Sequence, residues 1–205
     1  MGAQAGETRP VTPISGVILC GGKSRRMGTD KALLTHEDVR LVDRVYERLS
    51  SVAKPVYFAP GRVGRLGTLP GDELADERED SGPLGGVVAA LRRSPHELLA
   101  VVAVDMPWCS PPLFAAAAAL WGGEDAIVPV DKSGPQVLHA LYSLGALSRL
   151  RDALNEGRLS LRALLDDLKV LHLDESVWGR VDPSGRFALN LNRPEDLTLL
   201  AEFPE

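Results

Sequence analysis

The chain has 205 residues, of which 44% are hydrophobic and 5% aromatic, and its formal net charge is −5. This length allows one domain that buries roughly 70% of the unfolded surface. Phosphate-backbone binding needs a distributed positive face, so the acidic balance argues against nucleic acid as a partner. Because no apolar run reaches about 18 residues, we expect neither a transmembrane helix nor a membrane partner.

Cysteine usage and the first residues bear on location and domain organisation. The chain has two cysteines, Cys20 and Cys109, without C-x-x-C or zinc spacing. This argues against a disulfide framework and favours the reducing cytoplasm. Residues 1–13 lack the cationic start and apolar core of a signal peptide, so we expect a disordered N-terminal lead before a single domain at 14–205.

Apolar runs alternate with helical patterns along the first part of the chain. Runs that are apolar on both faces are typical of a parallel sheet, and we expect such strands at Ile14–Leu19, Pro55–Ala59, Leu98–Val104 and Asp125–Val130. Apolar residues at helical spacing predict helices at Val39–Val52, Leu84–Arg93 and Pro111–Trp121.

The second half continues with an extended stretch, two helices, two strands and a last helix. These are expected at Val137–Tyr142, Leu144–Asn155, Ser160–Leu168, Lys169–Leu173, Phe187–Leu191 and from Pro194, with Asn192 or Arg193 near the last cap. The alternation predicts an α/β protein: a Rossmann-like three-layer α/β/α sandwich with a mostly parallel sheet. Its ligand should lie beyond the carboxyl ends of the strands.

The most informative segment is LCGGKSRRMGTDK at residues 19–31, directly after the first expected strand. It contains three glycines, and its four cations against Asp30 give a local charge of 4 − 1 = +3. Glycines let backbone N–H groups approach an anion, so this segment predicts a phosphate-binding loop. The spacing matches neither a Walker loop nor G-x-G-x-x-G.

A second candidate is Asp105, which follows the expected strand Leu98–Val104 and precedes Met106-Pro107. Mg²⁺ usually takes one or two protein carboxylates together with phosphate oxygens and waters. A carboxylate at this sheet edge, near a phosphate-binding loop, therefore predicts a metal ligand. The alternative is an aspartate that only shapes the turn before Pro107.

The first segment, read as L-x-G-G-x-S-x-R-M-G-x-D-K, resembles the signature of the molybdenum cofactor guanylyltransferases. These belong to the nucleotidyltransferase superfamily, which includes the sugar-nucleotide pyrophosphorylases. Residues 76–86, 105–107, 136–142 and 190–196 resemble four further elements of that family. Three residues depart from its pattern: Ala59 in place of a common asparagine, and Glu79 and Val137 in place of prolines.

The resemblance implies a nucleotide-diphospho-sugar transferase-like fold and transfer of GMP from GTP to the phosphate of molybdenum-bound molybdopterin, with Mg²⁺ and release of pyrophosphate. The N-terminal half would bind the nucleotide and the C-terminal half the acceptor. Transient contacts with pterin-delivering or molybdoenzyme-assembly proteins are a further expectation. Carried over by motif, the expected catalytic residues are Arg26, Lys31 and Asp105, the last also as metal ligand; the nucleotide-binding residues Leu19, Cys20, Gly21, Gly22, Ser24, Lys31, Asp76, Gly82 and Asp105; and the acceptor-binding residues Tyr142, Asn190 and Asn192.

Other interpretations remain open at this point. One is a cytidylyltransferase on the same pterin or a guanylyltransferase on another phosphate acceptor; the glycine pair and Asp30 favour the guanine branch. Another is a non-catalytic carrier of GTP or pterin, which would not require a metal carboxylate such as Asp105. Structural alternatives also stand for Asp76 as a surface-turn residue, Tyr142 as a core aromatic and Asn192 as a helix cap.

Overall fold

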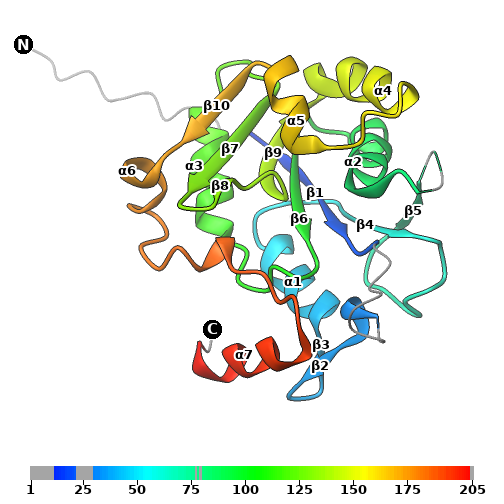
Figure 1. The fold of residues 1–205 in the computed structure, drawn as a ribbon, viewed down its shortest axis with the longest axis vertical. Coiled ribbons are helices and arrows are strands. Elements are labelled where there is room, and N and C mark those ends of the chain that lie inside the picture. Colours follow the sequence, from blue (N-terminus) through cyan, green and yellow to red (C-terminus); the bar gives the residue numbers. More distant parts are fainter. Residues whose placement is uncertain (1–11, 22–29, 77, 79, 204–205) are drawn as a thin grey trace, which may run out of the picture.

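The structure is a computed structural model, and it describes residues 12–21, 30–76, 78 and 80–203. Its main strands are β1 (Ile14–Leu19), β4 (Val56–Gly61), β5 (Glu73–Ala75), β6 (Leu98–Ala103), β7 (Ala126–Asp131), β8 (Gly134–Pro135), β9 (His139–Ser143) and β10 (Val170–Leu173). They form one sheet in the order β10-β7-β9-β6-β1-β4-β5, with β8 paired to β7 (Figure 1). Along this path β9 runs antiparallel to both neighbours and the other adjacent pairs are parallel, which confirms the mostly parallel sheet.

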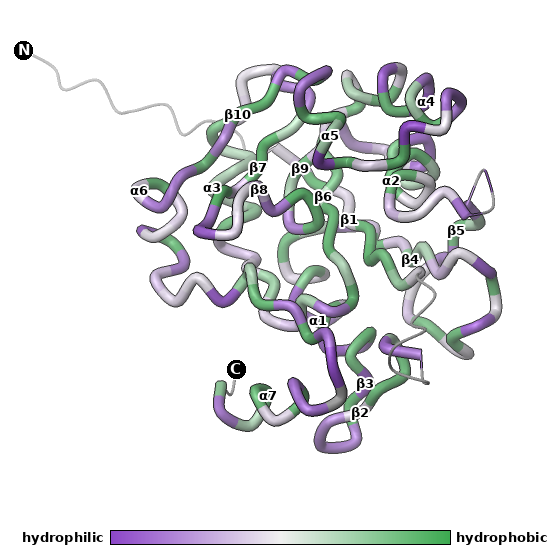
Figure 2. The backbone as a smooth tube through the Cα atoms, viewed as in Figure 1, coloured by the Kyte–Doolittle hydropathy of each residue, from purple (hydrophilic) through white to green (hydrophobic). Residues whose placement is uncertain are grey.

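Helices cover both faces of the sheet. Successive side chains of a strand point to opposite faces, and in β6 Leu98 and Val102 pack on one side while Leu99 and Val101 pack on the other. The first face is covered by α1 (Leu41–Ser50), α3 (Pro111–Leu120) and α7 (Thr198–Glu202), the second by α2 (Gly82–Arg93), α4 (Leu147–Asn155) and α5 (Leu161–Leu164). The central strands carry mainly hydrophobic colouring (Figure 2). The three-layer sandwich is thus confirmed.

Shorter elements complete the described part of the chain. They are α6 (Glu175–Trp178), the 3₁₀ turns η1 (Lys31–Leu33), η2 (Leu144–Ala146), η3 (Leu165–Asp167), η4 (Arg186–Ala188) and η5 (Pro194–Leu197), and the hairpin strands β2 (Thr35–His36) and β3 (Val39–Arg40). Among the described residues, no helix combines the length and apolarity that crossing a bilayer requires.

The helix predicted from Val39 begins two residues later, at Leu41, because Val39 and Arg40 belong to the β2–β3 hairpin. The hairpin turns at Glu37 and Asp38, whose φ angles are 52° and 61°. Two left-handed residues are what a two-residue hairpin turn needs. The hairpin could not be predicted because Glu-Asp is not a strong turn signal.

The strand predicted at Phe187–Leu191 is wrong. Residues 186–188 form η4, and the ring of Phe187 packs between His139 and Trp178, with centroid distances of 5.0 and 5.3 Å. The backbone N–H of Leu191 then donates to the carbonyl of Asp105 at 2.8 Å, beyond the end of β6. This segment crosses the carboxyl edge of the sheet instead of adding a strand to it, and so it reaches the region of the predicted site.

Candidate active site

The carboxyl ends of three strands are fixed together by backbone hydrogen bonds. The N–H groups of Cys20 and Gly21 donate to the carbonyl oxygen of Ala59 at 3.0 and 3.1 Å, which ties the end of β1 to β4. The carbonyl of Leu19 accepts from the N–H of Val104 at 3.1 Å, which ties the same end to the residues after β6. The start of the predicted phosphate-binding loop is therefore positioned by the sheet itself.

Part of the predicted loop lies outside the described residues. Gly22, Ser24 and Arg26 fall in the segment 22–29, and Glu79 is likewise outside. The roles expected for the first three stay predictions.

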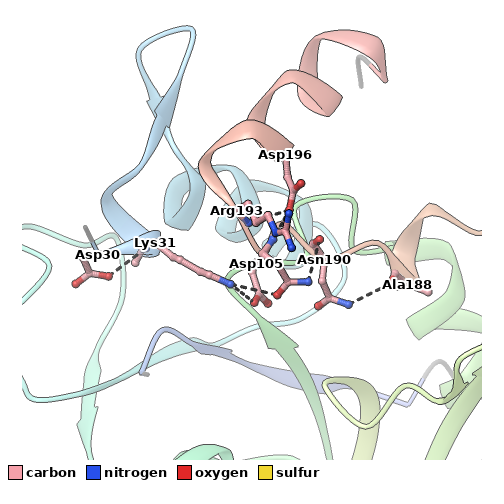
Figure 3. A network of polar contacts seen from close by, with 9 residues as sticks. Asp30, Lys31, Asp105, Ala188, Asn190, Arg193 and Asp196 are labelled. Atoms are coloured by element: carbon pink, nitrogen blue, oxygen red, sulfur yellow. Dashed lines mark hydrogen bonds and ion pairs between the residues drawn. The ribbon is translucent and has the colours of Figure 1, made fainter. Parts of the chain in front are cut away.

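Lys31 and Asp105 form the centre of the site (Figure 3). The carboxylate of Asp30 accepts from the backbone N–H of Ala32 at 3.1 Å and so caps η1, whose first residue is Lys31. The ammonium nitrogen of Lys31 lies 3.0 Å from Oδ2 of Asp105, with side-chain exposures of 18% and 22%. Two residues 74 positions apart thus meet at the end of β6 and remain open to a ligand.

The C-terminal motif reaches the same place. The backbone N–H of Leu191 donates a hydrogen bond to the carbonyl of Asp105. In the next residue, Oδ1 of Asn192 accepts from the Lys31 ammonium at 3.5 Å. Asn190 is exposed nearby, and its Nδ2 donates to the carbonyl of Ala188 at 3.1 Å. Both predicted acceptor-binding asparagines therefore lie beside the Lys31–Asp105 pair.

Asp196 shapes the turn that presents Asn192. Its Oδ2 accepts from the backbone N–H groups of Asn192 and Arg193 at 2.6 and 2.9 Å, at the start of η5. The side chain of Asn192 thus stays free of the capping role, and only its backbone N–H belongs to the cap.

The oxygen atoms at Asp105 fit a divalent cation that is held mainly by substrate. In the part of the chain that the structure describes, no group of three or more His, Cys, Asp or Glu side chains could hold a metal. A cage built by the protein alone is therefore not formed by these residues. Mg²⁺ bound through one carboxylate and the phosphates of a nucleotide fits a single, partly exposed Asp105.

Asp76 lies beside the glycines of the first strands. A Cβ atom built on Gly61 would lie 3.8 Å from Oδ2 of Asp76 and 4.0 Å from the Cα of Gly21. The hydroxyl of Ser81 lies 3.5 Å from the same oxygen of Asp76. Burial raises the pKa of Asp76, and the Ser81 hydrogen bond opposes that shift. A half-buried carboxylate thus faces the end of β1.

Glycine near the start of α2 lets this helix pack closely against Leu19 and Ala59, at the ends of β1 and β4. A Cβ atom on Gly86 would lie 2.8 Å from both the Cβ of Ala59 and Cδ2 of Leu19, closer than carbon atoms pack. Gly82 opens the helix with a φ of +60°, a conformation that favours glycine, and the space around its missing Cβ is open. The structure therefore gathers Leu19, Cys20, Gly21, Asp76 and Gly82 around one edge of the sheet.

Tyr142 is not part of either group. It pairs with Leu99, near the start of β6, whereas Asp105 follows the other end of that strand. Its side chain is fully buried, and its hydroxyl donates to the carbonyl of Val137 at 3.0 Å. Burial raises the pKa of this hydroxyl. The position is that of a core aromatic with a satisfied hydroxyl.

Arg65, which no sequence motif predicted, contacts the residues on both sides of segment 22–29. Its guanidinium donates to the carbonyls of Cys20 and Pro60 and forms an ion pair with Asp30. Arg65 lies in an irregular stretch without periodicity or motif, and no signal in the sequence distinguishes it from a surface arginine.

Comparison with known proteins identifies the family. Residues 16–173 match the family described as MobA-like NTP transferase domain. The chain belongs to this family. The nucleotidyltransferase class predicted from residues 19–31 is thereby confirmed.

Related MobA-like proteins match over nearly their whole lengths. A Chloroflexus aggregans protein named "Probable molybdenum cofactor guanylyltransferase" is 34% identical over 93% of this chain and 94% of its own. The "Molybdenum cofactor guanylyltransferase" of Desulfosudis oleivorans is 31% identical over 90% and 92%. The crystal structure of molybdopterin-guanine dinucleotide biosynthesis protein A from Archaeoglobus fulgidus superimposes with a TM-score of 0.81 at 24% identity, covering 92% of this chain and 97% of that one. This likeness supports the fold.

Proposed function

We propose that this chain is a molybdenum cofactor guanylyltransferase, which transfers GMP from GTP to the terminal phosphate of molybdenum-bound molybdopterin. The observation that carries the proposal is the Lys31–Asp105 pair, 3.0 Å apart at the carboxyl edge of a MobA-like sheet. The names of the relatives support the choice of nucleotide and acceptor.

In this reaction an oxygen of the acceptor phosphate attacks the α-phosphorus of GTP. The new P–O bond forms as the bond to pyrophosphate breaks, and pyrophosphate leaves. Such transfers depend mainly on positioning and on stabilisation of phosphate charge, so no covalent protein nucleophile is required. Lys31 supplies a fixed cation that faces the phosphates. Arg26, whose catalytic role is predicted from its motif, would supply a second.

Asp105 would hold Mg²⁺ at this edge. One carboxylate and the phosphates of a nucleotide can together bind this cation, and the bound cation would neutralise phosphate charge. In the free protein the Lys31 ammonium shields Oδ2 of Asp105, so that the carboxylate is not left uncompensated beside the sheet.

The missing Cβ of Gly86 lets α2 pack against Ala59 and Leu19, and the nucleoside would lie on the surface formed by Gly21 and Gly61, which carry no side chains. The carboxylate of Asp76 borders this surface, and its two oxygens can accept from the N1–H and N2–H₂ donors of guanine. Asn190 and Asn192, beside Lys31, would donate to the acceptor. Leu19 and Cys20 contribute backbone, while Gly82 permits the turn into α2.

One assay distinguishes this function from its alternatives. Pyrophosphate release is measured with GTP, CTP and ATP, with and without molybdenum-bound molybdopterin, and the dinucleotide product is identified by mass. We expect release only with GTP and pterin together. Preference for CTP would indicate a cytidylyltransferase. Turnover of GTP only with a different phosphate acceptor would indicate a guanylyltransferase that acts on that acceptor. Binding without turnover would indicate a carrier.

Cytoplasmic location and transient contacts with pterin-delivering or molybdoenzyme-assembly proteins remain parts of the proposal. The first rests on the cysteine usage of the sequence, and the second on the resemblance of residues 19–31 to the family signature. Co-purification of the chain with cytosolic fractions, and of partner proteins with the tagged chain, would test each.

A further inference from the structure

Arg65 contacts three backbone segments that meet at the active site. Its Nη2 donates to the carbonyl of Cys20 at 2.6 Å, and its Nε donates to the carbonyl of Pro60 at 3.2 Å. Its Nη1 forms an ion pair with the carboxylate of Asp30. One side chain therefore joins the end of β1, the end of β4 and the residue that caps η1.

The charge of Arg65 is already matched within the protein. The Asp30 carboxylate neutralises it, and each of the three guanidinium nitrogens has an acceptor. A planar guanidinium can serve three acceptors at once, which the single nitrogen of a lysine cannot do in the same geometry. These contacts fit a side chain that fixes the backbone better than one that binds phosphate.

The contacts of Asp30 lead directly to Lys31. While Oδ2 of Asp30 meets Arg65, its Oδ1 accepts from the N–H of Ala32 and thereby starts η1. Lys31 is the first residue of η1, and its ammonium lies 3.0 Å from Asp105. A displacement of Asp30 would therefore also displace Lys31, whose ammonium group faces the phosphates.

We infer that Arg65 is a positioning residue for Lys31, because it fixes Cys20 and Asp30 on the two sides of residues 22–29. The inference rests on the proposed function as far as it concerns turnover. Its structural part, the ordering of η1 by Arg65, does not.

The kinetic test uses Arg65→Ala, Arg65→Lys and the matched control Arg162→Ala. Arg162 also donates to two carbonyls, those of Ser133 and Pro135 at 3.4 and 2.9 Å, but on the β8 hairpin. Since misplacing a catalytic group by about 1 Å can cost up to about 10²-fold, we expect Arg65→Ala to lower kcat by about 10- to 100-fold. The Kd for GTP should change by less than about 3-fold, Arg65→Lys should be intermediate and Arg162→Ala normal.

A double-mutant cycle separates positioning from a general structural effect. If Arg65 acts through Lys31, adding Arg65→Ala to Lys31→Ala should lower the residual rate by less than about 3-fold. A full, multiplicative loss in the Lys31→Ala background would overturn the inference.

Hydrogen exchange tests the structural part independently of catalysis. Arg65→Ala should speed amide exchange at Ala32, Leu33 and Leu34, which close η1, whereas Arg162→Ala should not. If the unaltered protein transfers no GMP but Arg65→Ala still loosens η1, the proposed function fails and the ordering role stands. Unchanged exchange in η1 would overturn the inference even in an active enzyme.

Discussion

A buried histidine makes the stability of this protein depend on pH. His139 in β9 is fully buried between the rings of Phe114 and Phe187, and its Nε2 accepts from the backbone N–H of Ser110 at 2.9 Å. Burial lowers its pKa from 6.5 to about 4, so the folded protein holds the imidazole neutral. Between these two values the unfolded chain binds a proton that the folded chain does not.

The sign and size of the effect follow from this difference. A depressed histidine pKa contributes stability that is fully present above pH 6.5 and is lost as the pH falls through about 4. Each pH unit in this window is worth about 1.4 kcal/mol, so the whole shift corresponds to about 3 kcal/mol of the free energy of unfolding. That is a large part of the 5–15 kcal/mol typical of a folded domain.

Urea unfolding at pH 7, 5.5 and 4.5 measures the effect. Carboxylates also titrate in this range, so the test compares the unaltered protein with His139→Gln and with His172→Gln, whose histidine is exposed on β10. We expect His139→Gln to be less stable at pH 7 but to lose less stability on acidification, while His172→Gln follows the unaltered protein. Equal losses of stability on acidification in all three proteins would show that His139 is not the source of the pH dependence.

Two further predictions concern the site. Lys31→Ala should lower turnover by about 10² or more while the Tm stays unchanged, because it removes a fixed cation facing phosphate charge; Lys169→Ala, which removes an exposed lysine beside Glu124, is the control, and near-normal turnover of Lys31→Ala would contradict its role. Asp76→Asn should erode the preference for GTP over ATP more than it weakens overall binding, since an amide offers guanine a mixed edge; equal ratios of kcat/KM in Asp76→Asn and unaltered protein would contradict the assignment.

Much of the sheet could be predicted because its strands carry a local signal. Ile14–Leu19 and Leu98–Ala103 are apolar at every position except Ser15 and Gly16, as expected where both faces are covered by helices. The segment 187–191 is also partly apolar, yet it forms no strand. Its place is decided by long-range contacts of Phe187 with ring neighbours and of Leu191 with Asp105, which have no local pattern.

The site shows the same division. Lys31, Asp105 and Asn192 lie within motifs, and the structure brings them together although they are far apart in the sequence. Tyr142 also lies in a motif but is placed in the core, because its side chain packs on the face of the sheet that α2, α4 and α5 cover. Arg65 lies in no motif, and its role could not be predicted because its three acceptors come together only in the folded chain.

We expect Asp105 to hold a divalent cation during nucleotidyl transfer, and the Asp105→Asn variant examines this role. The matched control is Asp131→Asn, which alters another strand-end aspartate, at the end of β7, whose carboxylate is occupied by Ser133 and Gln136. GMP transfer is measured against Mg²⁺ concentration, with Tm and GTP affinity on the same preparations. We predict that Asp105→Asn keeps its fold and much of its GTP affinity but loses Mg²⁺-dependent transfer by about 10² or more, because an amide oxygen is a poorer ligand for a hard cation. An Asp105→Asn protein that is less stable yet transfers GMP with an unchanged response to Mg²⁺ would show that Asp105 shapes the turn and does not hold the cation.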